Sequence, residues 1–405
     1  MKNPRLRRDV QPIPVTVGQR RMLSFHDPLR IAREGIALDQ GTVPLLRMLD
    51  GSHDLRDIQI ELMRRNAGHI IPMDEIEAFI RALDDSLLLE SDRFAALKCK
   101  TVDDFCACSD RAACLAGKSY EKDPERLAQS IVETQNSLPP LDEDIRPREI
   151  SGILAPHIDT NVAWDVYVDT YRYLAGRRYD LVIILGINHN GSGGLWSISG
   201  KDYLTPLGRM EADREFVAGL KAGLPEGSLA ENDFDHKAEH SIEFQTVFLR
   251  HFLGGVPKIV PILCGSIHEF IRSGKDPLKD GRFLAMKQGI HDLIAERGLK
   301  TLFVSGVDFS HIGPKFGHDH PAEVLLPKAA AYDEAIIRGL MEANPELIFE
   351  QAARTGDYYN VCGLPSMLLF SWLMGPCTPK LLHCKVYDEK ATQSAVTYAS
   401  MIFTR

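Results

Sequence analysis

The sequence has little of several features that would assign it to a class at once. Its 405 residues carry a formal net charge of −9 and no basic tract, which argues against nucleic-acid binding as the main activity. No apolar run reaches the roughly 18 residues of a membrane span, and the most apolar stretch, residues 364–374, suits a buried helix. The basic opening lacks the apolar core of a secretory signal. We therefore expect a cytoplasmic protein with neither a membrane nor a nucleic-acid partner.

Cysteine is also sparse, at eight residues in 405, far below the density of a disulfide scaffold. Four of them nevertheless fall within the short segment KCKTVDDFCACSDRAAC: Cys99, Cys106, Cys108 and Cys114. Neighbouring thiolates could ligate zinc or an iron–sulfur cluster, but these spacings match no zinc-ribbon or ferredoxin pattern. We keep both interpretations, a metal site and ordinary thiols in a connecting segment.

Residues 1–95 have the pattern of a small, mostly helical domain. Apolar periodicity and stop signals predict helices over residues 42–49 and 54–65 and after Pro72, and a short strand or wing over residues 87–94. This is a winged-helix outline. It also looks like the small PqqD-type peptide-binding domains that accompany radical-SAM systems. Without a basic recognition helix, peptide or protein binding is favoured over DNA binding, and a structural cap is the alternative.

Residues 96–148 are expected to link this domain to a larger one, and they include a predicted helix over residues 123–134. Strand and helix patterns alternate from residue 149 to 405. The strands are EISGILA, DLVIILG, KIVPILCG, TLFVSGV, LLHCKVY and SAVTYASMIF, and the helices cover residues 163–174, 213–222, 240–252 and 284–297. This alternation is typical of an α/β fold whose central, largely parallel or mixed sheet is flanked by helices.

Polar side chains follow three of these strands where each strand ends. In chain order they are His157, Asp159, Asn188, His189, Asp308, Ser310 and His311. Parallel strands end along one edge of a sheet, where the ligands of such sheets collect, so we expect these side chains to meet there.

The segment DFDHKAEHSIEFQ adds further titratable groups to this set. It holds Asp235, His236, Glu239, His240 and Glu243, and the last three are expected on the first turns of a helix. Several imidazoles and carboxylates at one rim predict a metal or acid–base site. Two neutral imidazoles with one anionic ligand commonly hold Fe(II), and the same set could hold catalytic zinc.

Six motifs follow one another in the larger domain: GILAPHID, VIILGINHNG, YLTPLGRMEAD, EHSIEFQ, KIVPILCGS and VSGVDFSHIGPKFG. In this order they resemble the Memo-like family, whose bacterial members are called AmmeMemoRadiSam system protein B. The resemblance spans roughly residues 111–403. It implies a fold similar to that of class III extradiol ring-cleaving dioxygenases, with a non-haem Fe(II) at the end of a central sheet.

The resemblance implies roles for individual residues. His157 and His189 would be metal ligands, and His240 would match the histidine that moves a proton in the dioxygenases. The third ligand, a cysteine in animal Memo proteins, falls on Ser310. A hydroxyl is a poorer ligand, so either Asp308 or Asp235 would supply the anion or the ion would bind weakly.

Other positions are expected to line a substrate pocket. Asp159 departs from the family's usual residues after the first motif and would put a carboxylate beside the ion. The full set of expected pocket residues is Asp159, Asn188, Asp235, His236, Glu243 and His311.

Three functions fit such a site. The first is a dioxygenase-like oxidoreductase that holds Fe(II), or else zinc or copper, with His240 and Asp308 as catalytic residues. The second is a non-catalytic protein that binds a peptide or a radical-SAM partner. The third is a zinc-type hydrolase. The family resemblance does not choose among them, because shared folds host unrelated chemistry.

Overall fold

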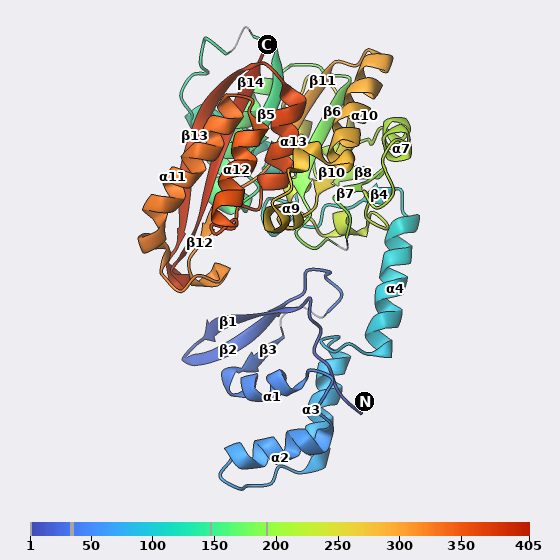
Figure 1. Ribbon diagram of the computed structural model, residues 1–405, viewed down its shortest axis with the longest axis vertical. Helices are drawn as coiled ribbons and strands as arrows, with labels where there is room; N and C mark the ends of the chain where they lie inside the picture. Colours follow the sequence, from blue (N-terminus) through green and yellow to red (C-terminus); the bar gives the residue numbers. More distant parts are fainter. Residues whose placement is uncertain (1, 33–35, 146–147, 192) are drawn as a thin grey trace. The chain divides into compact units, whose positions relative to one another are not determined.

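The computed structural model describes residues 2–32, 36–145, 148–191 and 193–405 (Figure 1). The chain divides into two compact units, Met1–Ala107 and Cys108–Arg405. This division differs from the expected one, because helix α4 (Asp92–Ala107) runs through the first part of the expected linker and the rest of that linker belongs to the second unit. No helix in the described ranges combines the length and the apolar character needed to cross a bilayer.

The first unit combines a small antiparallel sheet with helices. Its strands, in sheet order, are β1 (Gln11–Val17), β2 (Arg20–His26) and β3 (Ala37–Asp39). Its helices before α4 are α1 (Val43–Met48), α2 (Leu55–Arg65) and α3 (Met73–Asp85). They confirm the three predicted helices, and their buried leucine and isoleucine side chains share one core.

Two features of this unit differ from expectation. The sheet was missed because β1, QPIPVTV, contains prolines, which normally argue against a strand. The expected wing over residues 87–94 is wrong: Leu89 forms only an isolated bridge to Leu6, and α4 begins at Asp92. The apolar run there reflects burial instead, since Leu88 and Leu89 are both fully buried.

The second unit is a mixed α/β fold, as expected. Its main sheet has the order β12-β14-β5-β11-β6-β10-β7, with β13 also paired to β14. These strands are β5 (Ile150–Ala155), β6 (Leu181–Ile187), β7 (Trp196–Ile198), β10 (Lys258–Cys264), β11 (Thr301–Gly306), β12 (His311–Ile312), β13 (Thr378–Glu389) and β14 (Ser394–Thr404). Neighbours among β5, β11, β6 and β10 are parallel, and the other pairs are antiparallel.

A smaller sheet, nine α-helices and several short 3-10 helices complete this unit as it is described. The small sheet has the order β4 (Asp110–Arg111), β8 (Asp202–Thr205) and β9 (Gly208–Met210). The helices are α5 (Pro124–Ser137), α6 (Thr160–Tyr171), α7 (Arg214–Ala222), α8 (Ser241–Phe252), α9 (His268–Ser273), α10 (Gly281–Arg297), α11 (Ala322–Met341), α12 (Pro345–Thr355) and α13 (Leu364–Met374).

Helices cover both faces of the main sheet (Figure 1). Successive strand residues point to opposite faces. In β6, Leu181, Ile183 and Leu185 accordingly join the core shared with α10 and α13, whereas Val182 and Ile184 join the core shared with α6 and α8. Burial on both faces explains why the strand reads as a continuous apolar run.

The centre of the sheet brings three strand ends together. β11 lies between β5 and β6 and is parallel to both, so the segments that follow these strands leave the sheet at one edge, as predicted. Helix α8 begins at this edge. Ser241, its first residue, accepts a hydrogen bond on its hydroxyl oxygen from the backbone N–H of Ile187 at 2.9 Å.

Candidate metal centre

His157 follows β5 and is almost fully buried, with 2% of its side chain exposed. Its Nδ1 lies 3.0 Å from the carbonyl oxygen of Gly306 at the end of β11. A carbonyl can only accept, so Nδ1 carries the hydrogen and Nε2 keeps its lone pair. Burial, together with the nearby rings of His189 and His240, holds the pKa of His157 well below its usual range. The ring is therefore neutral, which is the form that ligates metals.

Glu239 holds the other two histidines. Its carboxylate, only 1% exposed, lies 3.0 Å from His189 Nδ1 and 3.1 Å from His240 Nδ1. It also accepts from the backbone N–H groups of His240 at 2.8 Å and Ser241 at 3.0 Å, at the start of α8. Burial alone would raise the pKa of Glu239, but the two imidazoles hold it well below its usual range. Both rings therefore donate through Nδ1 and leave Nε2 for another partner.

The three imidazole rings form one cluster. The ring centroids are 5.0 Å apart for His157 and His189, 5.2 Å for His157 and His240, and 4.9 Å for His189 and His240. His189 and His240 stack, while His157 meets both edge-on. The side chains of His189 and His240 are 30% and 35% exposed, so the cluster opens to solvent on their side.

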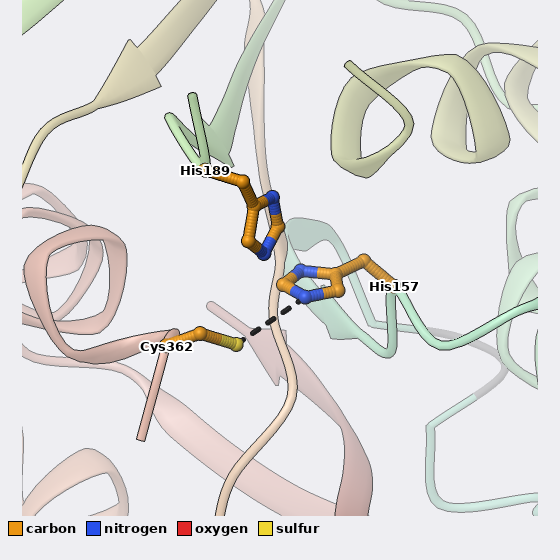
Figure 2. A group of neighbouring side chains, drawn as sticks. All are labelled: His157, His189 and Cys362. Atoms are coloured by element: carbon orange, nitrogen blue, oxygen red, sulfur yellow. Dashed lines mark hydrogen bonds between the residues drawn. The ribbon is translucent and has the colours of Figure 1, made fainter. Parts of the chain in front are cut away.

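Cys362 joins this cluster, although none of the sequence motifs indicates it. Its Sγ lies 3.3 Å from His157 Nε2 (Figure 2). One ring nitrogen each of His157 and His189 and the Cys362 Sγ lie within 4.8 Å of one another. Burial raises the pKa of the Cys362 thiol.

Cys362 was missed because it precedes helix α13 rather than following a strand. The only signal in the sequence was a single cysteine in NVCGLP, just before an apolar helix. The next residue is a glycine for a steric reason: a Cβ on Gly363 would lie 2.6 Å from the carbonyl oxygen of Asp308. Glycine thus lets this loop pack against the end of β11.

The structure does not bring Ser310 to the histidines, which corrects its expected place as the third ligand. The fully buried Ser310 hydroxyl donates to Asp333 of α11 at 2.6 Å. The backbone N–H of Thr397 in β14 donates to the Ser310 carbonyl at 2.9 Å. This pairing with β14 turns the serine side chain toward α11, and Cys362 takes the expected place beside His157.

Asp308, Asn188 and Asp235 lie at the same edge as the histidines. Asp308 accepts from the backbone N–H of His157 at 3.0 Å, and its other oxygen lies 3.5 Å from His157 Nε2. Asn188 donates to Asp235 at 2.8 Å. These carboxylates stand beside the cluster, although neither belongs to the two groups of convergent ligand atoms found among the described residues.

His311 lies near the cluster as well. Its Nδ1 is 3.0 Å from the carbonyl oxygen of Phe309. Burial is the main cause that lowers the pKa of His311 to about 4. It is therefore a neutral ring at neutral pH.

Three other expected pocket residues are held within the fold instead. His236 is fully buried, with Nδ1 2.7 Å from the Tyr203 hydroxyl. Asp159 caps α6 by accepting from the backbone N–H of Asn161 at 2.8 Å. Glu243 forms a buried ion pair with Arg111. Their side chains stabilise loops and helix ends.

Two adjoining pockets open beside the cluster. One, of about 250 Å³, is lined mainly by apolar side chains together with Cys362 and Asp357. The other, of about 450 Å³, is lined by His189, Arg272 and several glycines. They share Asn188, Gly265, Ser266 and His268. Pockets of this size accommodate small organic molecules.

The four cysteines from Cys99 to Cys114 are absent from the groups of convergent ligand atoms found among the described residues. Cys99, Cys106 and Cys108 are exposed, and Cys114 is partly buried. Among the described residues, the groups whose ligand atoms converge are His157, His189 and Cys362, and His189, Glu239 and His240.

The second unit is thus a mixed α/β fold that carries histidines and a cysteine at the carboxyl edge of its main sheet. The chain belongs to the Memo-like protein family, whose model matches residues 111–402, as the sequence resemblance predicted. A MEMO1 family protein of Aquifex aeolicus is 31% identical over 382 residues, 93% of this chain and 94% of that protein. MEMO1 family proteins of Methanosarcina barkeri and Thermococcus kodakarensis are 28% and 27% identical, over 72% and 73% of this chain and 99% of each relative.

The family match coincides with the second unit. The Methanosarcina barkeri and Thermococcus kodakarensis proteins align over 99% of their length with less than three quarters of this chain. The Aquifex alignment covers 93% of the chain and so includes most of the first unit.

Proposed function

We propose that this Memo-like protein is a metal-dependent oxidoreductase whose ion is held by His157, His189 and Cys362. The observation that carries the proposal is the convergence of these three ligand atoms within 4.8 Å at the carboxyl edge of the sheet. The donor set fits an ion, because the Gly306 carbonyl and the Glu239 carboxylate occupy the Nδ1 atoms and leave each Nε2 available. Metal-ligating histidines almost always have such a partner on the other nitrogen.

Iron is the ion we propose, and copper and zinc are the others that these donors would accept. Imidazole and thiolate ligands suit transition ions and disfavour magnesium and calcium. A bound redox-active ion would supply electron transfer to a substrate or to oxygen. Cys362 would give up its proton on ligation, since the thiolate is the form that binds metals.

We assign proton transfer to His240. Its Nδ1 donates to Glu239 at 3.1 Å, so the carboxylate stabilises the imidazolium formed when Nε2 takes up a proton. Asp308 holds the backbone of His157 and keeps that ring in place. The two adjoining pockets would take a small-molecule substrate.

Elemental analysis of protein purified anaerobically without added metal tests the proposal. The parent is compared with His157→Ala, His189→Ala and Cys362→Ser, and with Ser310→Ala as the matched control. We expect near-stoichiometric iron in the parent and in Ser310→Ala, and little in the other three. Zinc with the same pattern would favour the hydrolase. A parent that contains no iron, copper or zinc and takes up none would overturn the proposal in favour of a partner-binding protein.

A further inference from the structure

Arg111 and Glu243 form a buried ion pair, and Glu243 lies close in sequence to Glu239 and His240 of the histidine cluster. The Arg111 and Glu243 side chains are 0% and 1% exposed, and the guanidinium donates to one carboxylate oxygen. Glu243 also accepts from the backbone N–H of Leu115 at 2.8 Å and from the Tyr120 hydroxyl at 2.5 Å. The Cys114 backbone N–H and thiol complete its partners, at 3.1 and 3.0 Å. The segment just before α5 is thereby fastened to α8.

Arg111 also donates to two backbone carbonyls in the segment that leads into α8. Its Nε donates to the carbonyl of His236 at 2.9 Å, and a terminal nitrogen donates to the carbonyl of Glu239 at 2.7 Å. A guanidinium presents several donors in one rigid plane. A single side chain therefore sets where the backbone of Glu239 lies, while Glu243 sets where the guanidinium lies.

Glu239 in turn holds two of the three histidine rings. Its carboxylate meets Nδ1 of His189 at 3.0 Å and Nδ1 of His240 at 3.1 Å. His157 is held differently, by the carbonyl of Gly306 at 3.0 Å. The hydrogen bonds thus connect Arg111 to His189 and His240, whereas His157 is linked to these two only through contacts between the rings.

We propose that Arg111, held by Glu243, is a positioning residue that sets the orientation of the His189 and His240 rings through Glu239. It thereby strengthens the binding of the metal ion. The second statement rests on the proposed function, whereas ring orientation can be tested without any metal. The competing account is that the buried pair serves stability alone.

Arg111→Lys separates the two accounts. Lysine keeps a positive charge opposite Glu243, but its single ammonium cannot replace the planar fork that binds the carbonyls of His236 and Glu239. Asp213→Asn is the matched control in the same unit, since Asp213 is 3% exposed and pairs with Arg297 at 2.9 Å. If Arg111→Lys does not fold, Tyr120→Phe takes its place, because it removes one hydrogen bond to Glu243 and keeps the ion pair.

The first readout is the nitrogen NMR spectrum of the histidine rings in the metal-free full chain. We expect Arg111→Lys to shift the ring nitrogens of His189 and His240 more than those of His157, which only meets these rings edge-on. Tyr120→Phe should shift the same two rings by less, and Asp213→Asn should shift none of them. Equal changes in all three rings would indicate general loosening and would overturn the proposal, as would no change.

The second readout is Co(II) binding to the same proteins, followed by its visible absorption spectrum. Loss of a residue that orients metal ligands typically weakens metal binding about 10- to 100-fold. We expect a loss in that range for Arg111→Lys and a change of less than about twofold for Asp213→Asn. Parent-like Co(II) affinity in Arg111→Lys would overturn the positioning role. A parent that binds no Co(II) would instead count against the metal site, and the NMR result would still decide the ring orientation.

Discussion

The segment that follows β11 contacts two polar clusters, through Asp308 and through Ser310, and these clusters differ in which of their atoms remain available to bind a ligand. Around Ser310, the serine and Thr397 hydroxyls both donate to Asp333 at 2.6 Å, and the Ser310 backbone N–H donates to the Thr397 hydroxyl at 2.8 Å. In the histidine cluster, hydrogen bonds engage the Nδ1 atoms, while ring nitrogens of His157 and His189 converge with the Cys362 Sγ. A polar residue at a strand end therefore indicates only where a site can form. Whether that residue binds a ligand depends on which of its atoms the fold leaves available.

The carboxylates of the two clusters differ in the same sense. Asp333 meets hydroxyl groups, and burial raises its pKa to about 6. Glu239 is equally buried, but the imidazoles of His189 and His240 hold its pKa well below its usual range. Opposite charges within contact distance stabilise a carboxylate against desolvation, and neutral donors do so less. Glu239 is thus an anion that accepts from both imidazoles, whereas Asp333 accepts from two hydroxyl groups.

The largest expected effect comes from exchanging the thiol and the hydroxyl between the two clusters. Cys362→Ser should weaken metal binding more than about 100-fold, because loss of a ligand costs more than loss of the residue that orients one. The double variant Cys362→Ser, Ser310→Cys should not recover it, since residue 310 is directed to Asp333. Metal titration of both variants checks this. Recovery in the double variant would mean that position 310 can supply the third ligand after all.

Glu239→Gln is expected to have the next largest effect. A neutral amide can still accept from one imidazole through its oxygen, but its NH2 group cannot accept from the Nδ1 of the other. We expect metal binding to weaken about 10- to 100-fold. Asp333→Asn, the equivalent change in the other cluster, should leave the metal affinity within about twofold of the parent. Similar losses of metal affinity in both variants would show that the two clusters do not differ in this respect.

Asp333 should instead affect how the free energy of unfolding depends on pH. Its pKa is about 6 in the folded chain and near 3.8 when unfolded, so its proton-linked contribution is fully present below about pH 3.8 and is lost as pH rises through about 6. At about 1.4 kcal/mol per pKa unit, the loss is roughly 3 kcal/mol. The free energy of unfolding, measured between pH 4 and 7 by denaturant titration, should fall more steeply in the parent than in Asp333→Asn. Parallel curves would contradict this.

The strand ends could be predicted from sequence because they depend on local pattern. Apolar runs such as LVIILG identify the buried strands, and parallel order then brings His157 and His189 to one edge. Cys362 could not be predicted in this way, since it reaches His157 across more than 200 residues of sequence and only the packing of α13 on β11 and β6 brings it there.

Side-chain direction was equally hard to predict. Nothing in VSGVDFSHIG distinguishes Asp308, directed at His157, from Ser310, directed at Asp333; the pairing of residue 310 with β14 decides it. Glu239 and Glu243 lie four residues apart and both were candidates for the edge. The first holds the histidines and the second binds Arg111, because Arg111 approaches from a segment more than 100 residues earlier.

The smallest effect is expected for the cysteines whose spacing first suggested a metal cluster. Cys99, Cys106 and Cys108 are exposed, and substituting exposed side chains usually changes stability by less than about 0.5 kcal/mol. The triple serine variant should therefore keep both the metal content and the unfolding free energy of the parent. Cys114 is left intact because its thiol donates to Glu243 at 3.0 Å. Loss of one equivalent of metal from the triple variant, with Cys362 unchanged, would establish a second ion site in the segment that we interpret as carrying ordinary thiols.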